Sequence, residues 1–254
     1  MQPIMKCILL FAILFIESIA NNAGAQVYTI ESLDGAIQKI HVLPDDEKGT
    51  LNISYLNDTL HVGEFEGVQD SIAVLDRKFL KIVYSVRGGS GIHLRHTLLL
   101  CVRNGILYQS IHITSVFDEE FIDFSKKVDS LNPVDKKSVY ELKLNLLGSN
   151  MQNYKLNINL HDEKRSKHDT LNNYNHNEQV VLNFDTSQNI FYGSNESISE
   201  YFTVYDPKTQ KEHKEFIMGT FPVILLGTFN YYYIKDEWYE RNDFNELGKY
   251  SYRQ

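Results

Sequence analysis

The sequence of 254 residues contains few of the residues that support several specialised architectures. Its two cysteines exclude a disulfide-rich scaffold, and its five prolines and fourteen glycines are too few for a collagen-like or low-complexity chain. Basic residues are also in deficit, because 25 lysines and arginines face 33 aspartates and glutamates and leave a net charge of −8. Binding to phosphates requires a basic surface, so we predict no nucleic-acid partner.

Long hydrophobic runs are scarce, and the longest lies near the N-terminus. Residues 7–16 are apolar without interruption, Lys6 precedes them, and the small residues Ala23, Gly24 and Ala25 follow. A bilayer requires about 20 helical residues, so this run is too short to span one. The three-part pattern predicts a signal peptide over residues 1–25, with cleavage before Gln26. An N-terminal anchor and a buried core helix are the alternatives.

Export would simplify the remaining chain. Cys101 would be the only cysteine after cleavage, so no intramolecular disulfide could form. The longest later apolar run, residues 221–229, is interrupted by Pro222 and Gly227. We therefore expect no transmembrane span after cleavage and a periplasmic, cell-surface or secreted location.

The residues that are abundant suffice for a folded core. Hydrophobic residues make up 43% of the chain and aromatic residues 12%, which excludes global disorder. Apolar and polar residues alternate with period two between short turns, which predicts an all-β fold of antiparallel meanders in a sandwich or partly open barrel. No fixed repeat supports a propeller. The predicted strands are residues 27–30, 37–43, 51–56, 71–75, 79–86, 92–102, 106–116, 139–147, 154–160, 179–184, 201–205, 216–218, 223–228 and 231–234.

One segment favours a helix instead. Within residues 116–128, Phe117, Phe121 and two later apolar residues recur at helical spacing. The segment after it, residues 129–138, contains Pro133 and several charges and is the best candidate for a domain boundary. Neither half shows a complete set of well-spaced strands, so we favour a single domain over residues 26–254.

The clearest local prediction is a hairpin around Asn104 and Gly105. This pair favours a two-residue type I′ turn, which would place Arg103 opposite Ile106. Continued pairing predicts that one face is core and that the other is solvated or lightly covered. The predicted core pairs are Val102–Leu107, Leu100–Gln109, Leu98–Ile111 and His96–Ile113. The preceding loop, residues 88–91, should keep strand 79–86 in register, with paired positions that sum to an even number.

Several polar groups invite a catalytic or metal-binding interpretation. His93 and His96 should point to opposite faces of a strand, and His112 should lie too far from His93 to share a metal. We interpret His96 as a hydrogen-bonded, semi-buried residue. Residues 161–178 carry metal-ligating side chains at spacings that match no known motif, which favours a solvated loop. The glycine-rich loop at residues 88–92 lacks the spacing of a nucleophile elbow. We therefore predict no catalytic residue, no metal site and no cofactor.

Residues 229–244 form the most distinctive stretch. Aromatic faces stack on sugar rings and protein partners, and neighbouring charged groups hydrogen-bond to hydroxyls. The alternative is that these rings fill the core. The predicted ligand-binding residues are Tyr231, Tyr233, Asp236, Trp238, Tyr239 and Arg241.

Short triplets of aspartate, serine or threonine, and an aliphatic residue occur four times, the first at Asp58. They resemble an O-glycosylation signal of exported bacterial proteins. The sequence therefore suggests a non-enzymatic binding or interaction module of a bacterial envelope, with a glycan or envelope protein as partner. The alternatives are a metal-assisted hydrolase of the same compartment, using residues 161–176, and a structural surface subunit. The sequence does not specify the oligomeric state.

Overall fold

A computed structural model describes residues 25–45, 47–68, 72–122, 134–150, 152–242 and 244–253. Apart from Ala25, the predicted signal peptide lies outside these ranges, as do residues 123–128 of the predicted helix and residues 129–133 of the candidate boundary. The described chain consists mainly of strands, nearly all of them paired antiparallel, which confirms the predicted fold class. Among the described residues, no helix is long and apolar enough to cross a membrane.

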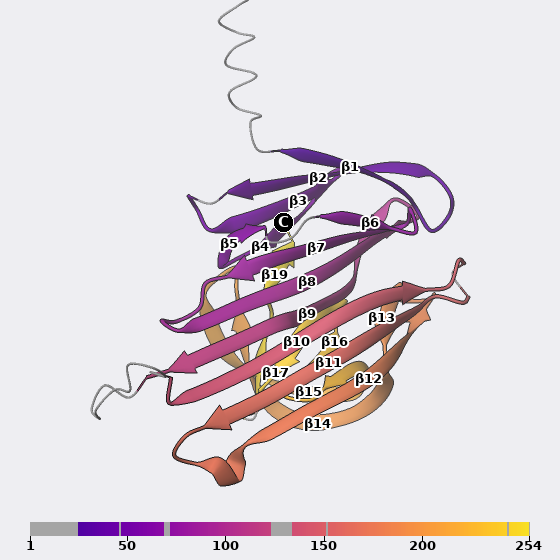
Figure 1. Cartoon of the computed structure of the whole chain (residues 1–254). Coiled ribbons are helices and arrows are strands. Elements are labelled where there is room, and N and C mark those ends of the chain that lie inside the picture. Colours follow the sequence, from indigo (N-terminus) through magenta and orange to yellow (C-terminus); the bar gives the residue numbers. More distant parts are fainter. Residues whose placement is uncertain are drawn as a thin grey trace, which may run out of the picture.

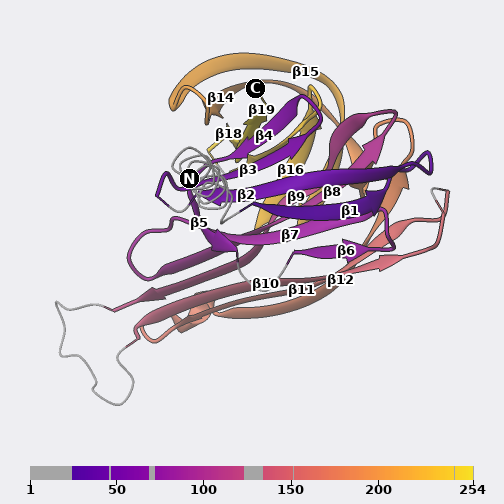
Figure 2. The ribbon, with the colours of Figure 1, turned by 90° about the horizontal axis from the view of Figure 1, so that it is seen from above.

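The strands form two open sheets and one closed barrel (Figures 1 and 2). The N-terminal sheet has the order β1-β2-β3-β4-β19. Its strands are β1 (Gln26–Glu31), β2 (Ile37–Asp45), β3 (Thr50–Tyr55), β4 (Asp58–Val62) and β19 (Ser251–Arg253). The last strand of the chain thus completes the sheet that the first four begin.

A nine-stranded sheet runs through the middle of the molecule in the order β13-β12-β11-β10-β9-β8-β7-β5, with β6 also on β7. Its strands are β5 (Phe65–Val68), β6 (Ala73–Leu75), β7 (Phe79–Val86), β8 (Ile92–Arg103), β9 (Ile106–Phe121), β10 (Lys136–Leu147), β11 (Lys155–Ser166), β12 (Tyr174–Asp185) and β13 (Ile190–Tyr192). The short 3-10 helix η1 (Thr170–Asn172) precedes β12. Because β9 pairs with β10, this sheet continues across the candidate boundary at residues 129–138.

The barrel follows in sequence. It consists of β14 (Ser194–Asp206), β15 (Lys211–Leu226), β16 (Phe229–Ile234), β17 (Glu237–Arg241) and β18 (Glu246–Gly248). The pairing of β14 with β18 is parallel and closes the ring. In the view from above, the outer strands β14 and β15 lie on the side opposite β10–β12 (Figure 2).

Hydrophobic clusters fill the space between these layers. One cluster joins the N-terminal sheet to one face of β7 and β8, and a second joins the opposite face of the large sheet to β16 and β17. The strand β8 contributes to both clusters from its two faces. Leu98 and Leu100 pack in the first cluster, and Leu99 and Cys101 pack in the second. The prediction that one face of this hairpin is only lightly covered is therefore wrong.

The hairpin turn itself is confirmed. Asn104 and Gly105 have positive φ, and Arg103 pairs with Ile106. The pairing of β7 with β8 also has the predicted parity, with Leu80 opposite Leu100. Register slips within β8–β9, however, because the shift between Leu99 and Leu100 leaves one extra residue in β9. Beyond this bulge Leu99, and not Leu98, faces Ile111.

The predicted helix at residues 116–128 is wrong over the part that the structure describes. Residues 116–121 continue β9 and pair with β10, so that Glu120 and Lys137 lie across from each other and their charged atoms are 2.8 Å apart. Phe117 packs against the ring of Phe229, with 6.0 Å between centroids. Sheet pairing and opposite cross-strand charges thus outweigh the helical spacing of the phenylalanines.

The polar segment at residues 161–178 is not the predicted loop. Residues 161–166 extend β11 and residues 174–178 begin β12, so most of the segment is a hairpin. Side-chain amides support it, since Nδ1 of His161 lies 3.0 Å from Oδ1 of Asn177 across the two strands. Cross-strand hydrogen bonds explain how so polar a segment remains regular.

Candidate functional site

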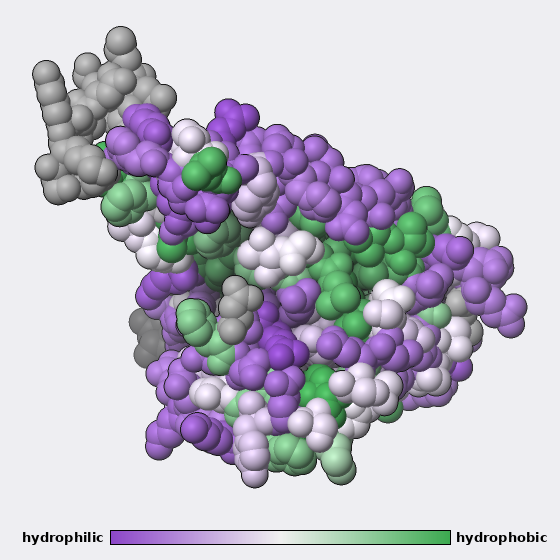
Figure 3. Space-filling model, turned by 90° about the horizontal axis from the view of Figure 1, so that it is seen from below, coloured by the Kyte–Doolittle hydropathy of each residue, from purple (hydrophilic) through white to green (hydrophobic). Residues whose placement is uncertain are grey.

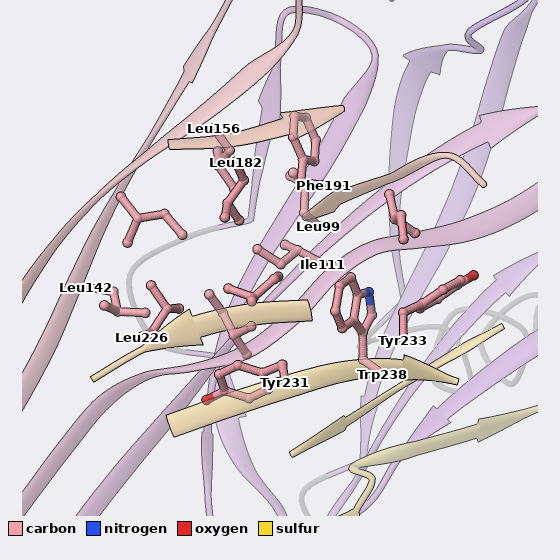
Figure 4. Packing of buried hydrophobic residues seen from close by; sticks show 14 of the residues in the cluster. Leu99, Ile111, Leu142, Leu156, Leu182, Phe191, Leu226, Tyr231, Tyr233 and Trp238 are labelled. Carbon is pink, nitrogen blue, oxygen red and sulfur yellow. The ribbon is translucent and has the colours of Figure 1, made fainter. Parts of the chain in front are cut away.

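The predicted aromatic cluster lies on the β16–β17 hairpin. Lys235 and Asp236 form its turn, and both have positive φ. Tyr233 pairs with Trp238, so both side chains lie on one face together with Tyr231. Figure 4 shows these three residues in one cluster with Leu99, Ile111 and Leu226.

Burial of these rings is nearly complete. Trp238 is 3% exposed, and its Nε1 donates a hydrogen bond to the carbonyl oxygen of Gln109 at 3.0 Å. Tyr231 is fully buried, and its hydroxyl accepts a hydrogen bond from the backbone N–H of Thr114. Tyr233 and Tyr239 are 6% and 8% exposed. None of these four rings offers an exposed face for stacking on a ligand.

The two charged members of the predicted cluster lie apart from the rings' buried face. Asp236 is exposed at the turn. Arg241 is half-buried at the barrel, where its Nη2 lies 3.0 Å from Oε1 of Glu200 and its guanidinium lies over the ring of Phe202. The structure thus separates the six predicted residues into core rings, a turn and a barrel ion pair.

A different group of polar residues surrounds a recess on the outside of the barrel. The recess has a volume of about 200 Å³, and β14, β15, β17 and β18 contribute to its lining. Three carboxyl groups and two tyrosine rings line it, and none of its described lining residues is basic. These five residues, which we call the acidic recess, are Tyr205, Glu212, Glu240, Glu246 and Tyr250.

Glu240 connects the recess to the interior. Its Oε2 accepts a hydrogen bond from Oγ1 of Thr114 on β9 at 2.9 Å. Burial raises the pKa of this carboxyl above its ordinary value, while hydrogen bonds from Thr114, Tyr250 and Tyr231 act in the opposite direction. A carboxyl in this position can accept a proton or a hydrogen bond from a group that enters the recess.

Behind Tyr250 lies a buried polar group. The ring of His96 packs 4.0 Å from that of Tyr250, and the hydroxyl of Tyr84 lies 2.6 Å from Nε2 of His112. The two histidine rings are 6.0 Å apart, and both residues are almost fully buried. Neither ring nitrogen of His96 has a hydrogen-bond partner among the described residues, so the prediction of a hydrogen-bonded, semi-buried His96 is wrong.

Burial controls the protonation of this group. It lowers the pKa of His112 to about 3, and it lowers the pKa of His96, which neighbouring His112 lowers further. Burial likewise raises the pKa of Tyr84 and Tyr250. Both imidazoles are therefore neutral at pH 7, and the carboxyl of Glu240 reaches this part of the core through its hydrogen bond with Tyr250.

Metal binding finds no support in the described part of the chain. No group of three or more histidine, cysteine, aspartate or glutamate side chains there is arranged to hold an ion. His161 lies on the sheet against Asn177, whereas Nε2 of His168 lies 3.3 Å from Oδ1 of Asp135. The segment that motivated the hydrolase alternative thus spreads its imidazoles over different partners.

The acidic recess was missed because its residues come from distant positions in the sequence. One local signal was present, since Glu240 has the same parity as Trp238 along a short strand and therefore shares its inward face. A carboxylate on the face of the hairpin that otherwise carries buried aromatic rings indicates a buried polar site. No protein-family model, curated protein or solved structure matches this chain.

Proposed function

We propose that this protein is a non-enzymatic, exported binding module of a bacterial envelope, and that its acidic recess receives a basic side chain of a partner protein. The observation that carries the proposal is the lining of the recess by three carboxyl groups and two tyrosines without a basic residue. The three-part pattern of residues 1–25 supports the exported location.

The chemistry of the recess favours a cation. Glutamate carboxylates accept charge-assisted hydrogen bonds from ammonium and guanidinium groups, which carry only donors. Tyrosine rings attract the same groups through cation–π contacts. Inside a partly enclosed recess these attractions are stronger than at an open surface, because less water screens them.

The whole chain carries a negative net charge, as the recess does. A net charge of −8 attracts basic partners from a distance and repels acidic ones, which raises the rate of encounter. Entry of a cation would also stabilise the ionised form of Glu240, whose pKa burial holds above the ordinary value. Binding should therefore release a proton and strengthen as the pH rises through that pKa.

A titration with arginine amide, followed by NMR of the protein backbone, tests the proposal. We expect saturable shifts at Glu240, Glu246 and Tyr250 that weaken at high salt. Glu246→Gln should reduce the affinity several-fold, because it removes a charge from the recess while leaving the exposed strand end intact. Glu66→Gln removes an exposed carboxylate elsewhere and should leave the affinity unchanged.

Neutral N-acetylglucosamine is the second probe. Saturable shifts of the same residues with the sugar, and none with arginine amide, would replace the basic partner with a glycan. Equal loss of binding in Glu246→Gln and Glu66→Gln would show that only overall charge attracts the probe. Absence of shifts with both probes would remove the recess as a binding site.

A further inference from the structure

The nine-stranded sheet ends in a strand with a long unpaired edge. β12 pairs with β11 along one side, from Tyr174 to Asn183, but on its other side β13 covers only Asn183 to Asp185. Residues 174–182 therefore have no strand beside them in the described part of the chain. Figure 1 shows β12 along the lower margin of this sheet, with the short β13 beside only one end of it.

This edge is accessible as well as unpaired. All side chains from residue 174 to residue 179 are exposed, and Tyr174 retains 44% of its surface. Leu171, in the short helix η1 that precedes the strand, is 96% exposed. The backbone groups along such an edge repeat at a spacing that only another extended strand can match.

We propose that the occupant of this edge is a second copy of the same chain, joined through antiparallel pairing of the two β12 strands about a two-fold axis. Opposed residues in a continuous sheet lie on the same face, so their numbers must add to an even value when identical strands meet this way. The axis must then pass midway between the two copies of one residue, and the central candidates are His176, Asn177 and Glu178.

Charge decides between these registers. An axis at Glu178 would place two glutamates directly opposite each other, which is unfavourable. An axis at His176 would place Tyr174 opposite Glu178 and His176 opposite its own copy, so no imidazole of one chain would face a carboxylate of the other. An axis at Asn177 places His176 of each copy opposite Glu178 of the other, so that an imidazole of one chain faces a carboxylate of the other and can donate a hydrogen bond to it.

The remaining pairs of the Asn177 register also match. Asn175 lies opposite Gln179, and Asn177 lies opposite its own copy, so amides face amides on the outer side. Tyr174 lies opposite Val180, an aromatic and β-branched pair that stabilises antiparallel strands. The strand is thus complementary to itself over residues 174–180, and two nine-stranded sheets would become one.

The surface beside this edge is partly hydrophobic, as expected of a surface that a partner covers. The view from below, towards the side on which β12 and β14 lie lowest, shows a band of hydrophobic side chains between two polar areas (Figure 3). Contiguous apolar surface of this kind marks interaction sites more often than free surface. A second copy that continues the sheet would approach from this side.

Light scattering coupled to size-exclusion chromatography tests the pairing. The protein should elute with twice the mass of one chain at micromolar concentration. His176→Glu places like charges opposite each other at two points of the interface, so the dissociation constant should rise at least ten-fold. The residue swap His176→Glu with Glu178→His restores both histidine–glutamate pairs and should restore the dimer.

A matched control separates the interface from a general charge effect. His213 and Glu215 repeat the same arrangement on β15, with Nε2 and Oε2 3.5 Å apart, and the His213 side chain is as exposed as that of His176. His213→Glu should therefore leave the dimer intact. A monomeric wild-type protein, a dimer that survives His176→Glu, or failure of the residue swap to restore association would overturn the proposal.

Discussion

At the scale of single residues, burial determines what the aromatic side chains do. The rings of Tyr231 and Trp238 were attractive as ligand platforms because charged residues surround them in the sequence. In the fold, period-two alternation sends these rings inward and Asp236 outward at the turn. Their aromatic identity and strand parity could be predicted, but the layer that covers them, β8 and β9, follows from contacts far away in the sequence.

Trp238→Ala provides a direct measure of this burial. The variant should lose about 3–5 kcal/mol of unfolding free energy, because it leaves a cavity and removes the hydrogen bond to the carbonyl oxygen of Gln109. Phe244→Ala, which removes a ring that is 84% exposed, should change stability by less than about 0.5 kcal/mol. Urea denaturation of both variants measures the difference, and a Trp238→Ala protein of wild-type stability would contradict the assignment of this ring to the core.

At the scale of elements, hairpins were easier to predict than registers. The Asn104-Gly105 turn fixed the first pairs of β8 and β9 through local chemistry alone. One extra residue, Ser110, then shifted the pairs that follow it and moved Ile111 to the opposite face from the predicted one, and a second shift follows between Arg95 and His96. The hydroxyl of Ser110 donates a hydrogen bond to the carbonyl oxygen of Asn189, 79 positions later in the chain. The contact that stabilises the bulge therefore could not be found from the neighbouring sequence.

The turn itself can be tested with a pair of glycines. Gly105 has a φ of 74°, and a β-carbon there would meet no atom within 4 Å, so Gly105→Ala tests conformation without a clash. We expect a loss of about 1–2 kcal/mol, the cost of a left-handed conformation for an L-residue. Gly63 has equal space around it and no left-handed φ.

Gly63→Ala is therefore the matched control, and it should cost far less in the same denaturation experiment. Equal effects of the two alanines would indicate that the hairpin turn tolerates other conformations.

At the scale of the whole molecule, a buried polar group lies where the layers meet. Tyr84, His96 and His112 belong to the large sheet, Tyr250 precedes the last strand of the N-terminal sheet, and Glu240 comes from the barrel. Sequence proximity suggested grouping His93 with the other histidines, but His93 is exposed and accepts a hydrogen bond from Arg95. No local pattern could predict that Tyr250 would cover His96, because 154 positions separate them in the chain.

The stability of the whole fold should fall in mild acid because of these histidines. Burial lowers the pKa of folded His112 to about 3, whereas the unfolded residue takes up a proton near pH 6.5. Below pH 6.5 the unfolded state thus binds a proton that the folded state does not, and stability decreases by up to about 1.4 kcal/mol per pH unit for each such histidine. The raised pKa of Glu240 acts in the opposite direction, since its stabilising effect is lost as the pH rises.

Urea unfolding of the wild type and His112→Gln between about pH 5 and 7 isolates the contribution of this residue. The variant should be less stable at pH 7, because the partner of the Tyr84 hydroxyl is altered, but its stability should depend less on pH. His213→Gln, at an exposed histidine, should keep the wild-type slope. A slope unchanged by His112→Gln would show that the imidazole is already accessible to protons.

The position of β19 has a consequence for the order in which the molecule can form. Arg253 on this strand bonds to Asp58 on β4, 195 positions away, and β19 supplies the outer neighbour of β4. A ribosome releases β1–β4 long before it releases β19, so the growing chain displays an unpaired strand edge throughout the synthesis of both later sheets. Closing so long a loop is slow, so the edge of β4 stays open to other strands until β19 is in place.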